Sequence, residues 1–299
     1  MSGSAVGTTA ATDGTAARTD DGALPFVEIR GLHKRFGANR VLRGVDLVVP
    51  RGSVFTILGG SGSGKSVLLK HLVGLLRPDA GRVVVDGVDA TAFGEAEWIP
   101  VRRRIGYVFQ GAALFDSLDV YENLAYPLRE HEDWPEERIA RRVAQCLEAV
   151  GLAGVERRMP AALSGGMRKR VGVARAIALE PSAILYDEPT TGLDPGNSRR
   201  IGRLIRSLQQ RLHATSVVVT HDLELCKTIS DRVALLRHGV VCEEGSIEEL
   251  RAGALPAVAE FLDGEGEDDA AAAHAEAGDD GPGDGGPGDD GRKEAERGR

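Results

Sequence analysis

An eight-residue glycine-rich segment constrains this chain more than any other feature. Residues 59–66 read Gly-Gly-Ser-Gly-Ser-Gly-Lys-Ser and fit the phosphate-binding pattern G-x-x-x-x-G-K-[ST] at every position. The preceding residues 54–58 form an apolar, β-rich run that predicts a buried strand, and residues 67–76 predict a helix. A strand, a glycine loop and a helix in this order are typical of a nucleotide phosphate site.

The residue types in this loop suit a bound triphosphate. Glycines let backbone N–H groups wrap a phosphate closely, and the helix start adds a positive dipole end. Lys65 supplies a charge for the β- and γ-phosphates, and Ser66 supplies a hydroxyl for Mg²⁺. The alternative is a glycine-rich turn with a chance Lys-Ser pair, which the flanking strand and helix disfavour. The predicted nucleotide-binding residues of the loop are Gly59, Gly60, Ser61, Gly62, Ser63, Gly64, Lys65 and Ser66.

Composition argues against several classes of protein. No apolar run approaches the ~20 residues of a membrane-spanning helix, and we expect no secretory signal at the N-terminus. Cys146, Cys226 and Cys242 have neither metal-ligand nor disulfide spacing, which is typical of core cysteines in a reducing cytosol. From residue 264 onward, 12 acidic and 4 basic residues account for the whole formal charge of −8. The rest of the chain has no basic excess, so we expect no nucleic-acid partner.

We expect three regions along the chain. Residues 1–24 lack periodicity and predict a disordered leader, and residues 264–299 are rich in Gly, Asp and Pro and predict a disordered acidic tail. Residues 25–263 alternate strand and helix patterns, which predicts one α/β domain. Residues 111–165 contain helical patterns and predict a helical insertion into that domain.

Two local patterns refine this interpretation. Ile139, Val143 and Leu147 repeat at i, i+4 and i+8, which predicts a helix with one apolar face. The arginine run at residues 102–104 precedes the predicted strand at residues 105–110. So short a run carries little information, and we interpret it as a solvated face beside a strand rather than a nucleic-acid patch.

Polar residues follow several predicted strands. Asp187 ends an apolar strand downstream of the phosphate loop, where the Mg²⁺-side carboxylate of such enzymes is found. Glu188 comes next and is a candidate to orient or deprotonate the attacking water, the alternative being a surface acid. His221 follows another buried strand, so it is expected at the ligand crevice rather than as a structural histidine. Gln110 ends a fourth strand on a polar amide.

A second helix start has the features of an anion-binding terminus. Residues 163–167 read Leu-Ser-Gly-Gly-Met, with Ser164 as a good N-cap and two glycines exposing backbone N–H groups. No lysine accompanies them, so we expect Ser164, Gly165 and Gly166 to complete a nucleotide site rather than to hold one alone. Phe36 precedes the loop strand and is a candidate to stack on adenine, although the residue taken alone favours core packing.

The ordered set of these motifs resembles the nucleotide-binding subunit of an ABC transporter. The set comprises the phosphate loop, Gln110, residues 163–167, Asp187 with Glu188, residues 193–194 and His221. The resemblance implies a RecA-like α/β P-loop ATPase core with an antiparallel β subdomain and an inserted helical subdomain. It also implies an ATP hydrolase that works as a homodimer, with two ATP molecules sandwiched between head-to-tail subunits.

The same resemblance implies a role for each candidate on the catalytic side. Phe36 stacks on adenine, and His221 holds the γ-phosphate. Glu188 is the catalytic base. Gln110 touches Mg²⁺ and the attacking water, and it links the site to the helical subdomain.

The remaining roles concern the metal and the second subunit. Ser66, Gln110 and Asp187 are the implied Mg²⁺ residues. Asp194 lies at the dimer seam. The residues implied to reach the γ-phosphate held by the other protomer are Ser164, Gly165 and Gly166.

Four stretches resemble, more closely, the ATPases of Mla/Mce-type lipid transporters. They are residues 65–71, 109–118, 121–131 and 164–171, the last with Met167 where many relatives carry Gln. The resemblance implies a peripheral subunit at the cytoplasmic face of the bacterial inner membrane that powers phospholipid transport. Its implied partners are an integral-membrane permease, a periplasmic MCE lipid-binding protein and, in many systems, a small STAS-domain subunit. Gly60 and the acidic tail depart from the family pattern.

Three other functions remain to be weighed. An ABC importer ATPase for a polar solute, such as an amino acid, has identical nucleotide chemistry and stays open. A soluble ABC protein acting on ribosomes or DNA is disfavoured, because the chain has one set of motifs and no heptad run. A phosphoryl-transfer kinase does not need the stretch at residues 163–167.

Overall fold

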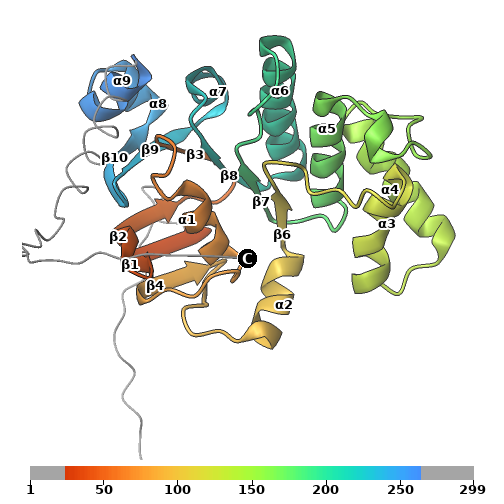
Figure 1. The fold of residues 1–299 in the computed structure, drawn as a ribbon, viewed down its shortest axis with the longest axis horizontal. Helices are drawn as coiled ribbons and strands as arrows, with labels where there is room; N and C mark the ends of the chain where they lie inside the picture. Colours follow the sequence, from red (N-terminus) through yellow and green to blue (C-terminus); the bar gives the residue numbers. More distant parts are fainter. Residues whose placement is uncertain (1–23, 264–299) are drawn as a thin grey trace, which may run out of the picture.

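The computed structural model describes residues 24–263, which form two β-sheets and the helices that pack on them (Figure 1). The predicted leader over residues 1–24 and the predicted acidic tail over residues 264–299 lie outside the described residues, apart from the exposed Leu24. The expected domain boundaries therefore stay predictions.

The larger sheet has six strands in the order β10-β9-β3-β8-β7-β6. β10 runs antiparallel to β9, and the other neighbouring pairs are parallel. Every residue of β3, β7 and β8 is buried, which explains why their sequences are nearly continuous apolar runs. The strands are β3 (Val54–Leu58), β6 (Ile105–Val108), β7 (Ala183–Asp187), β8 (Thr215–Thr220), β9 (Arg232–Arg237) and β10 (Val240–Ser246).

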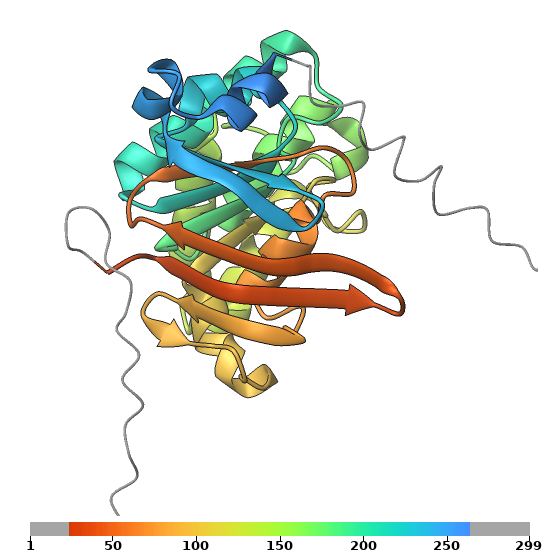
Figure 2. The ribbon, with the colours of Figure 1, turned by 90° about the vertical axis from the view of Figure 1, so that its left-hand side faces the viewer.

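The smaller sheet is antiparallel, in the order β2-β1-β4-β5, and Figure 2 shows its strands lying across one side of the molecule. Its apolar side chains share one core with α1 and with one face of the larger sheet. This sheet is the predicted antiparallel part of the fold. Its strands are β1 (Val27–Phe36), β2 (Asn39–Val49), β4 (Ala80–Val85) and β5 (Val88–Asp89).

Helices cover the opposite face of the larger sheet. Side chains of α3, α4, α5 and α6 form a second apolar core there, and α7, α8 and α9 enclose a third one with β9. Figure 1 shows α3 and α4 grouped at the end of the molecule farthest from β1 and β2, as expected for a helical insertion. The helices are α1 (Lys65–Leu72), α2 (Glu95–Arg103), α3 (Val120–His131), α4 (Glu136–Ala149), the 3₁₀ turn η1 (Pro160–Ala162), α5 (Gly165–Ala176), α6 (Pro195–Leu212), α7 (Leu223–Ile229), α8 (Ile247–Arg251) and α9 (Pro256–Leu262).

Arg103 and Arg104 are exposed directly before β6, in keeping with a solvated face beside a strand, but the helix that the run closes was not predicted. Arg102 and Arg103 form the last turn of α2. Arg102 donates to the Val73 carbonyl (2.7 Å) and pairs with Glu95. Only Trp98 of α2 is buried, so the sequence carries no apolar repeat that would have predicted this helix.

Candidate active site

Four neighbouring strands of the larger sheet end at one edge, and their ends carry the candidate residues. β3 leads into the phosphate loop, β6 leads to Gln110, β7 ends at Asp187, and β8 leads to His221. Ligand crevices in open parallel sheets form at the carboxyl ends of the strands. Residues far apart in the sequence are therefore neighbours at this edge.

A cavity of about 620 Å³ opens at this edge. Glu188, His221 and Gln110 line it together with the phosphate loop. The loop residues that line it are Gly60, Ser61, Gly62, Gly64, Lys65 and Ser66. One cavity thus contains the predicted phosphate-binding loop together with all three predicted catalytic residues.

The Glu188 carboxylate is 7% exposed and is surrounded by polar groups. His221 Nδ1 lies 2.9 Å from its Oε2, and the ammonium of Lys65 lies 3.4 Å from its Oε1. The hydroxyls of Thr191 (3.2 Å) and Thr220 (3.4 Å) donate to the same Oε2. These contacts fix the carboxylate beside Lys65, the predicted phosphate-binding lysine, and this is the position that a base for the attacking water would need.

The backbone of Glu188 is strained. Its φ of +48° lies in the left-handed region, which costs a residue other than glycine about 1–3 kcal/mol. The Glu188 N–H donates to the Val219 carbonyl (3.0 Å), and Lys169 Nζ donates to the Glu188 carbonyl (3.2 Å). Burial lowers the pKa of Lys169, opposed by the charge of Glu188. Both bonds hold the chain in the conformation that directs Glu188 into the cavity.

Asp187 has a donor on each carboxylate oxygen. Ser66 Oγ donates to Oδ1 (2.7 Å), and the Tyr107 hydroxyl donates to Oδ2 (3.1 Å). Burial, with the Asp187 charge, raises the pKa of Tyr107 far above its usual value, so this hydroxyl stays a neutral donor.

The oxygen atoms at this point fit Mg²⁺. The hydroxyl of Ser66, the carboxylate of Asp187 and the amide of Gln110 offer hard oxygen ligands. Residues 24–263 contain no cluster of three or more His, Cys, Asp or Glu side chains suited to a metal. The donor set therefore suits a cation held by a few protein oxygens together with phosphate and water, which is how Mg²⁺ is commonly bound beside nucleotides.

The second helix start lies outside this cavity. Ser164 caps α5 with its hydroxyl, and Ser164 and Gly165 are exposed. A Cβ on the buried Gly166 would lie 3.1 Å from the side chain of Asn197, which donates to Asp194 at the start of α6. These bonds lower the pKa of Asp194. The starts of α5 and α6 thus form one surface, separate from the nucleotide cavity of the same chain.

Phe36 ends β1 and does not line the cavity. Its ring is 48% exposed, and Lys34 Nζ lies 5.7 Å from the ring centroid. Core packing is therefore excluded for this side chain, and stacking on adenine stays a prediction.

Sequence reasoning missed Tyr107, Lys169 and the two threonines that contact Glu188. The only signal for Tyr107 was a phenol within an otherwise apolar strand. Lys169 and the threonines belong to motifs that had been recognised, but their contacts depend on how α5 and β8 pack beside β7.

The family described as ABC transporter matches residues 42–191, which include the phosphate loop, Ser164 and Glu188. A Mycobacterium leprae protein named "Probable ribonucleotide transport ATP-binding protein mkl" is 41% identical over 247 residues, covering 82% of this chain and 71% of that protein. The chain belongs to the ABC transporter family. It is an ATP-binding, ATP-hydrolysing subunit of an ABC transporter, and its α/β fold with an antiparallel sheet and a helical part is the fold predicted.

Other members of the ABC transporter family have similar sequences or structures. "Methionine import ATP-binding protein MetN 2" of Rhodococcus jostii is 42% identical and covers 75% of this chain; the chain spans 66% of that relative's length. The structure of cbiO1 from Clostridium perfringens has a TM-score of 0.71 at 30% identity, covering 76% of this chain and 91% of that one. A dimeric ATP-binding cassette in a post-hydrolysis state with ADP and Pi has a TM-score of 0.69 at 32% identity, covering 74% and 98%.

Proposed function

We propose that this chain powers phospholipid transport, as one of two ATPase subunits that bind a permease at the cytoplasmic face of the bacterial inner membrane. A periplasmic MCE protein would deliver or receive the lipid, and a STAS-domain subunit is a further candidate partner. No helix between residues 24 and 263 has the length and apolar character needed to cross a bilayer. In this proposal the transported molecule passes through the permease.

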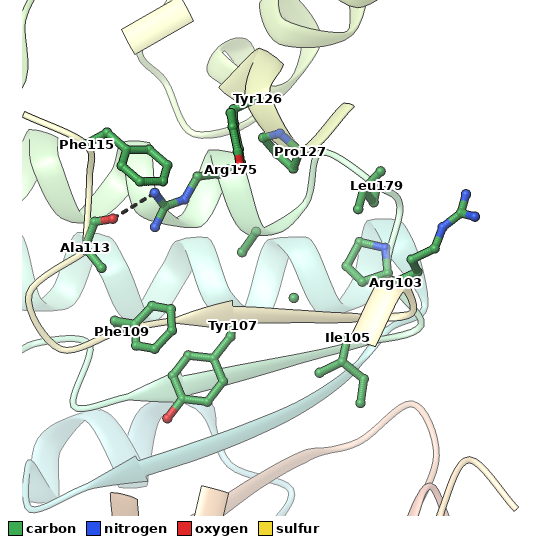
Figure 3. Close-up of a pocket in the computed structure, with 13 residues that line it drawn as sticks. Arg103, Ile105, Tyr107, Phe109, Ala113, Phe115, Tyr126, Pro127, Arg175 and Leu179 are labelled. Carbon is green, nitrogen blue, oxygen red and sulfur yellow. Dashed lines mark hydrogen bonds between the residues drawn. The ribbon is translucent and has the colours of Figure 1, made fainter. Parts of the chain in front are cut away.

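The observation that carries this proposal is a groove of about 350 Å³ between β6, α3 and α5, which we call the aromatic groove (Figure 3). Phe115 and Tyr126 meet edge to face at 5.4 Å and are 46% and 50% exposed. Phe109 lines the groove beside them and is 37% exposed. Exposed apolar groups gathered in this way are typical of a surface that binds a partner.

The aromatic groove contains the residues that resemble lipid-transport ATPases. Phe109 and Phe115 belong to the stretch at residues 109–118, and Tyr126 belongs to the stretch at residues 121–131. Apart from Gln110, the residues of these two stretches that line a cavity line the aromatic groove and not the nucleotide cavity, and in this proposal they select the partner. Their resemblance therefore supports a permease of the lipid-transport class.

The residues of the nucleotide cavity perform the hydrolysis in this proposal. Lys65 and the loop N–H groups bind the phosphates, Glu188 accepts a proton from the attacking water, and His221 holds the γ-phosphate. Mg²⁺ held by Ser66, Asp187 and Gln110 would neutralise phosphate charge. The start of α5 from the second subunit closes over the γ-phosphate, so that ATP bridges two incomplete halves.

A second candidate is an importer of a polar solute. It is favoured by the names of the relatives, which include methionine import proteins and a probable ribonucleotide transport protein. Its nucleotide chemistry would be identical, so only the partner distinguishes the two functions.

The test is to purify the tagged chain from detergent-solubilised native membranes and identify the proteins and lipids that accompany it. A permease with a periplasmic lipid-binding subunit and bound phospholipid is the expected result. A solute-type permease without that subunit would replace the lipid proposal with the importer. Recovery of the chain without any permease would contradict both.

A further inference from the structure

We propose that Tyr107 is a positioning residue, which holds the Asp187 carboxylate for Mg²⁺ and couples its orientation to the packing of the aromatic groove. The inference rests on the metal role proposed for Asp187. Tyr107 makes two contacts, one with Asp187 and one with Phe109.

The first contact concerns the carboxylate. β6 and β7 are parallel neighbours, and Tyr107 pairs with Leu185, so its side chain reaches two residues along β7 to Asp187. Its hydroxyl binds Oδ2 while Ser66 binds Oδ1, and the carboxylate plane is therefore set by two donors from different elements. Removal of the phenol hydroxyl would leave Oδ2 without this donor and free the carboxylate to rotate about its terminal bond.

The second contact concerns the groove. Tyr107 lines the aromatic groove, and its ring lies 4.3 Å from that of Phe109, centroid to centroid, with the planes 36° apart. Figure 3 shows the Tyr107 hydroxyl pointing away from Phe115, Tyr126 and the rest of the groove. The rigid Tyr107 side chain thus contacts Phe109 of the groove with its ring and the Asp187 carboxylate with its hydroxyl. A shift of the ring in the groove must also move the hydroxyl.

Direct metal binding tests the positioning role. The full-length chain is saturated with a non-hydrolysable ATP analogue and titrated with Mn²⁺, and free Mn²⁺ is measured by electron paramagnetic resonance. Tyr107→Phe should weaken Mn²⁺ binding roughly tenfold, the size of one hydrogen bond to a charged group, while metal-free affinity for the analogue stays unchanged. Tyr121→Phe is the matched control, because that hydroxyl also donates to a carboxylate at 3.1 Å, on Glu136, and it should leave Mn²⁺ binding unchanged.

A double-mutant cycle tests the coupling to the groove. Phe109→Leu should weaken Mn²⁺ binding in the wild-type background and add nothing to Tyr107→Phe, because Phe109 acts through Tyr107. Additive effects would mean that Phe109 acts by another route and would overturn the coupling.

Asp187→Asn separates this inference from the site on which it rests. If Asp187→Asn loses Mn²⁺ binding while Tyr107→Phe keeps it, the positioning role is wrong and the metal site stands. If Asp187→Asn binds Mn²⁺ like the wild type, the proposed metal site itself is wrong.

Discussion

The starts of α1 and α5 are both glycine-rich helix termini, yet they lie in very different surroundings. At α1, Gly64 takes a φ of +105°, and a Cβ there would lie 2.9 Å from Leu42, so only glycine fits. Lys65 follows it and is buried in the nucleotide cavity. At α5, Ser164 caps the helix, Gly165 is exposed, and neither residue lines the cavity that contains Lys65.

The two termini differ in the cation they carry and in whether one chain could bind a phosphate there by itself. At the α1 terminus, Lys65 Nζ lies 3.4 Å from Oε1 of Glu188, the proposed base, and this terminus is suited to bind a triphosphate within one chain. The α5 terminus has N–H groups and Arg168 nearby but no lysine in the place of Lys65, and Ser164 and Gly165 are exposed. It is suited to add the last contacts to a phosphate that another subunit already holds.

The largest loss of ATP hydrolysis is expected from a substitution in the cavity beside the α1 terminus. Glu188→Gln removes the base but keeps the shape of the side chain, so ATP hydrolysis should fall by roughly 10²–10⁴-fold while ATP binding persists. Steady-state phosphate release and nucleotide binding check this. Glu148→Gln, on an exposed position of α4, is the control. Near-normal turnover in Glu188→Gln would remove this residue from the role of base.

On the α5 side, Gly165→Asp should reduce hydrolysis on the order of 10²-fold, the size expected when a preorganised contact to a reacting anion is lost. The nearest atoms to a Cβ at Gly165 are 3.9 and 4.0 Å away, so the chain can fold with the new side chain. ATP binding by the single chain should not change. A parallel loss of ATP binding would place Gly165 in the same half-site as Lys65 and contradict the comparison.

A smaller effect, on the free energy of unfolding, is expected from a substitution where α5 meets the loop after β6. Arg175 donates to the carbonyls of Ala113 (2.8 Å) and Ala112 (2.9 Å), whose φ values of +46° and +65° are left-handed. Arg175→Ala should lower the free energy of unfolding by about 1–3 kcal/mol, because it removes donors to carbonyls of a strained loop.

Chemical denaturation measures this effect. Arg103→Ala is the control, since it removes only a surface ion pair with Glu132 and should cost at most about 1 kcal/mol. Equal losses in both variants would show that Arg175 does not hold the loop in place.

The smallest effect on ATP hydrolysis is expected from a deletion that touches neither helix terminus. Deletion of residues 264–299 should leave ATP hydrolysis within about twofold, because a segment of that composition contributes no apolar core. A large loss of hydrolysis in the purified chain would show that the tail takes part in the site. Loss of assembly alone would show that it binds a partner.

The sequence predicted the sheet edge that carries the site better than the loop after β6. The phosphate loop follows β3, Asp187 and Glu188 lie at the end of β7, and His221 follows β8. Because these strands read as buried and parallel, the pattern alone predicts one shared edge. The left-handed Ala112 and Ala113 could not be predicted, because alanine gives no signal for positive φ and Arg175 stabilises it from another element. Contacts that depend on how separate elements pack have no local pattern in the sequence.

The most direct test of the account is whether two defective chains repair one another. Lys65→Ala disables the α1 terminus and Gly165→Asp disables the α5 terminus, so each purified variant should be nearly inactive in ATP hydrolysis. In a mixed dimer, the intact phosphate loop of one chain would face the intact α5 start of the other. The account predicts that mixing the two variants restores a measurable part of the wild-type rate. A mixture no more active than the separate variants, although mixed dimers form, would contradict a site shared between two subunits.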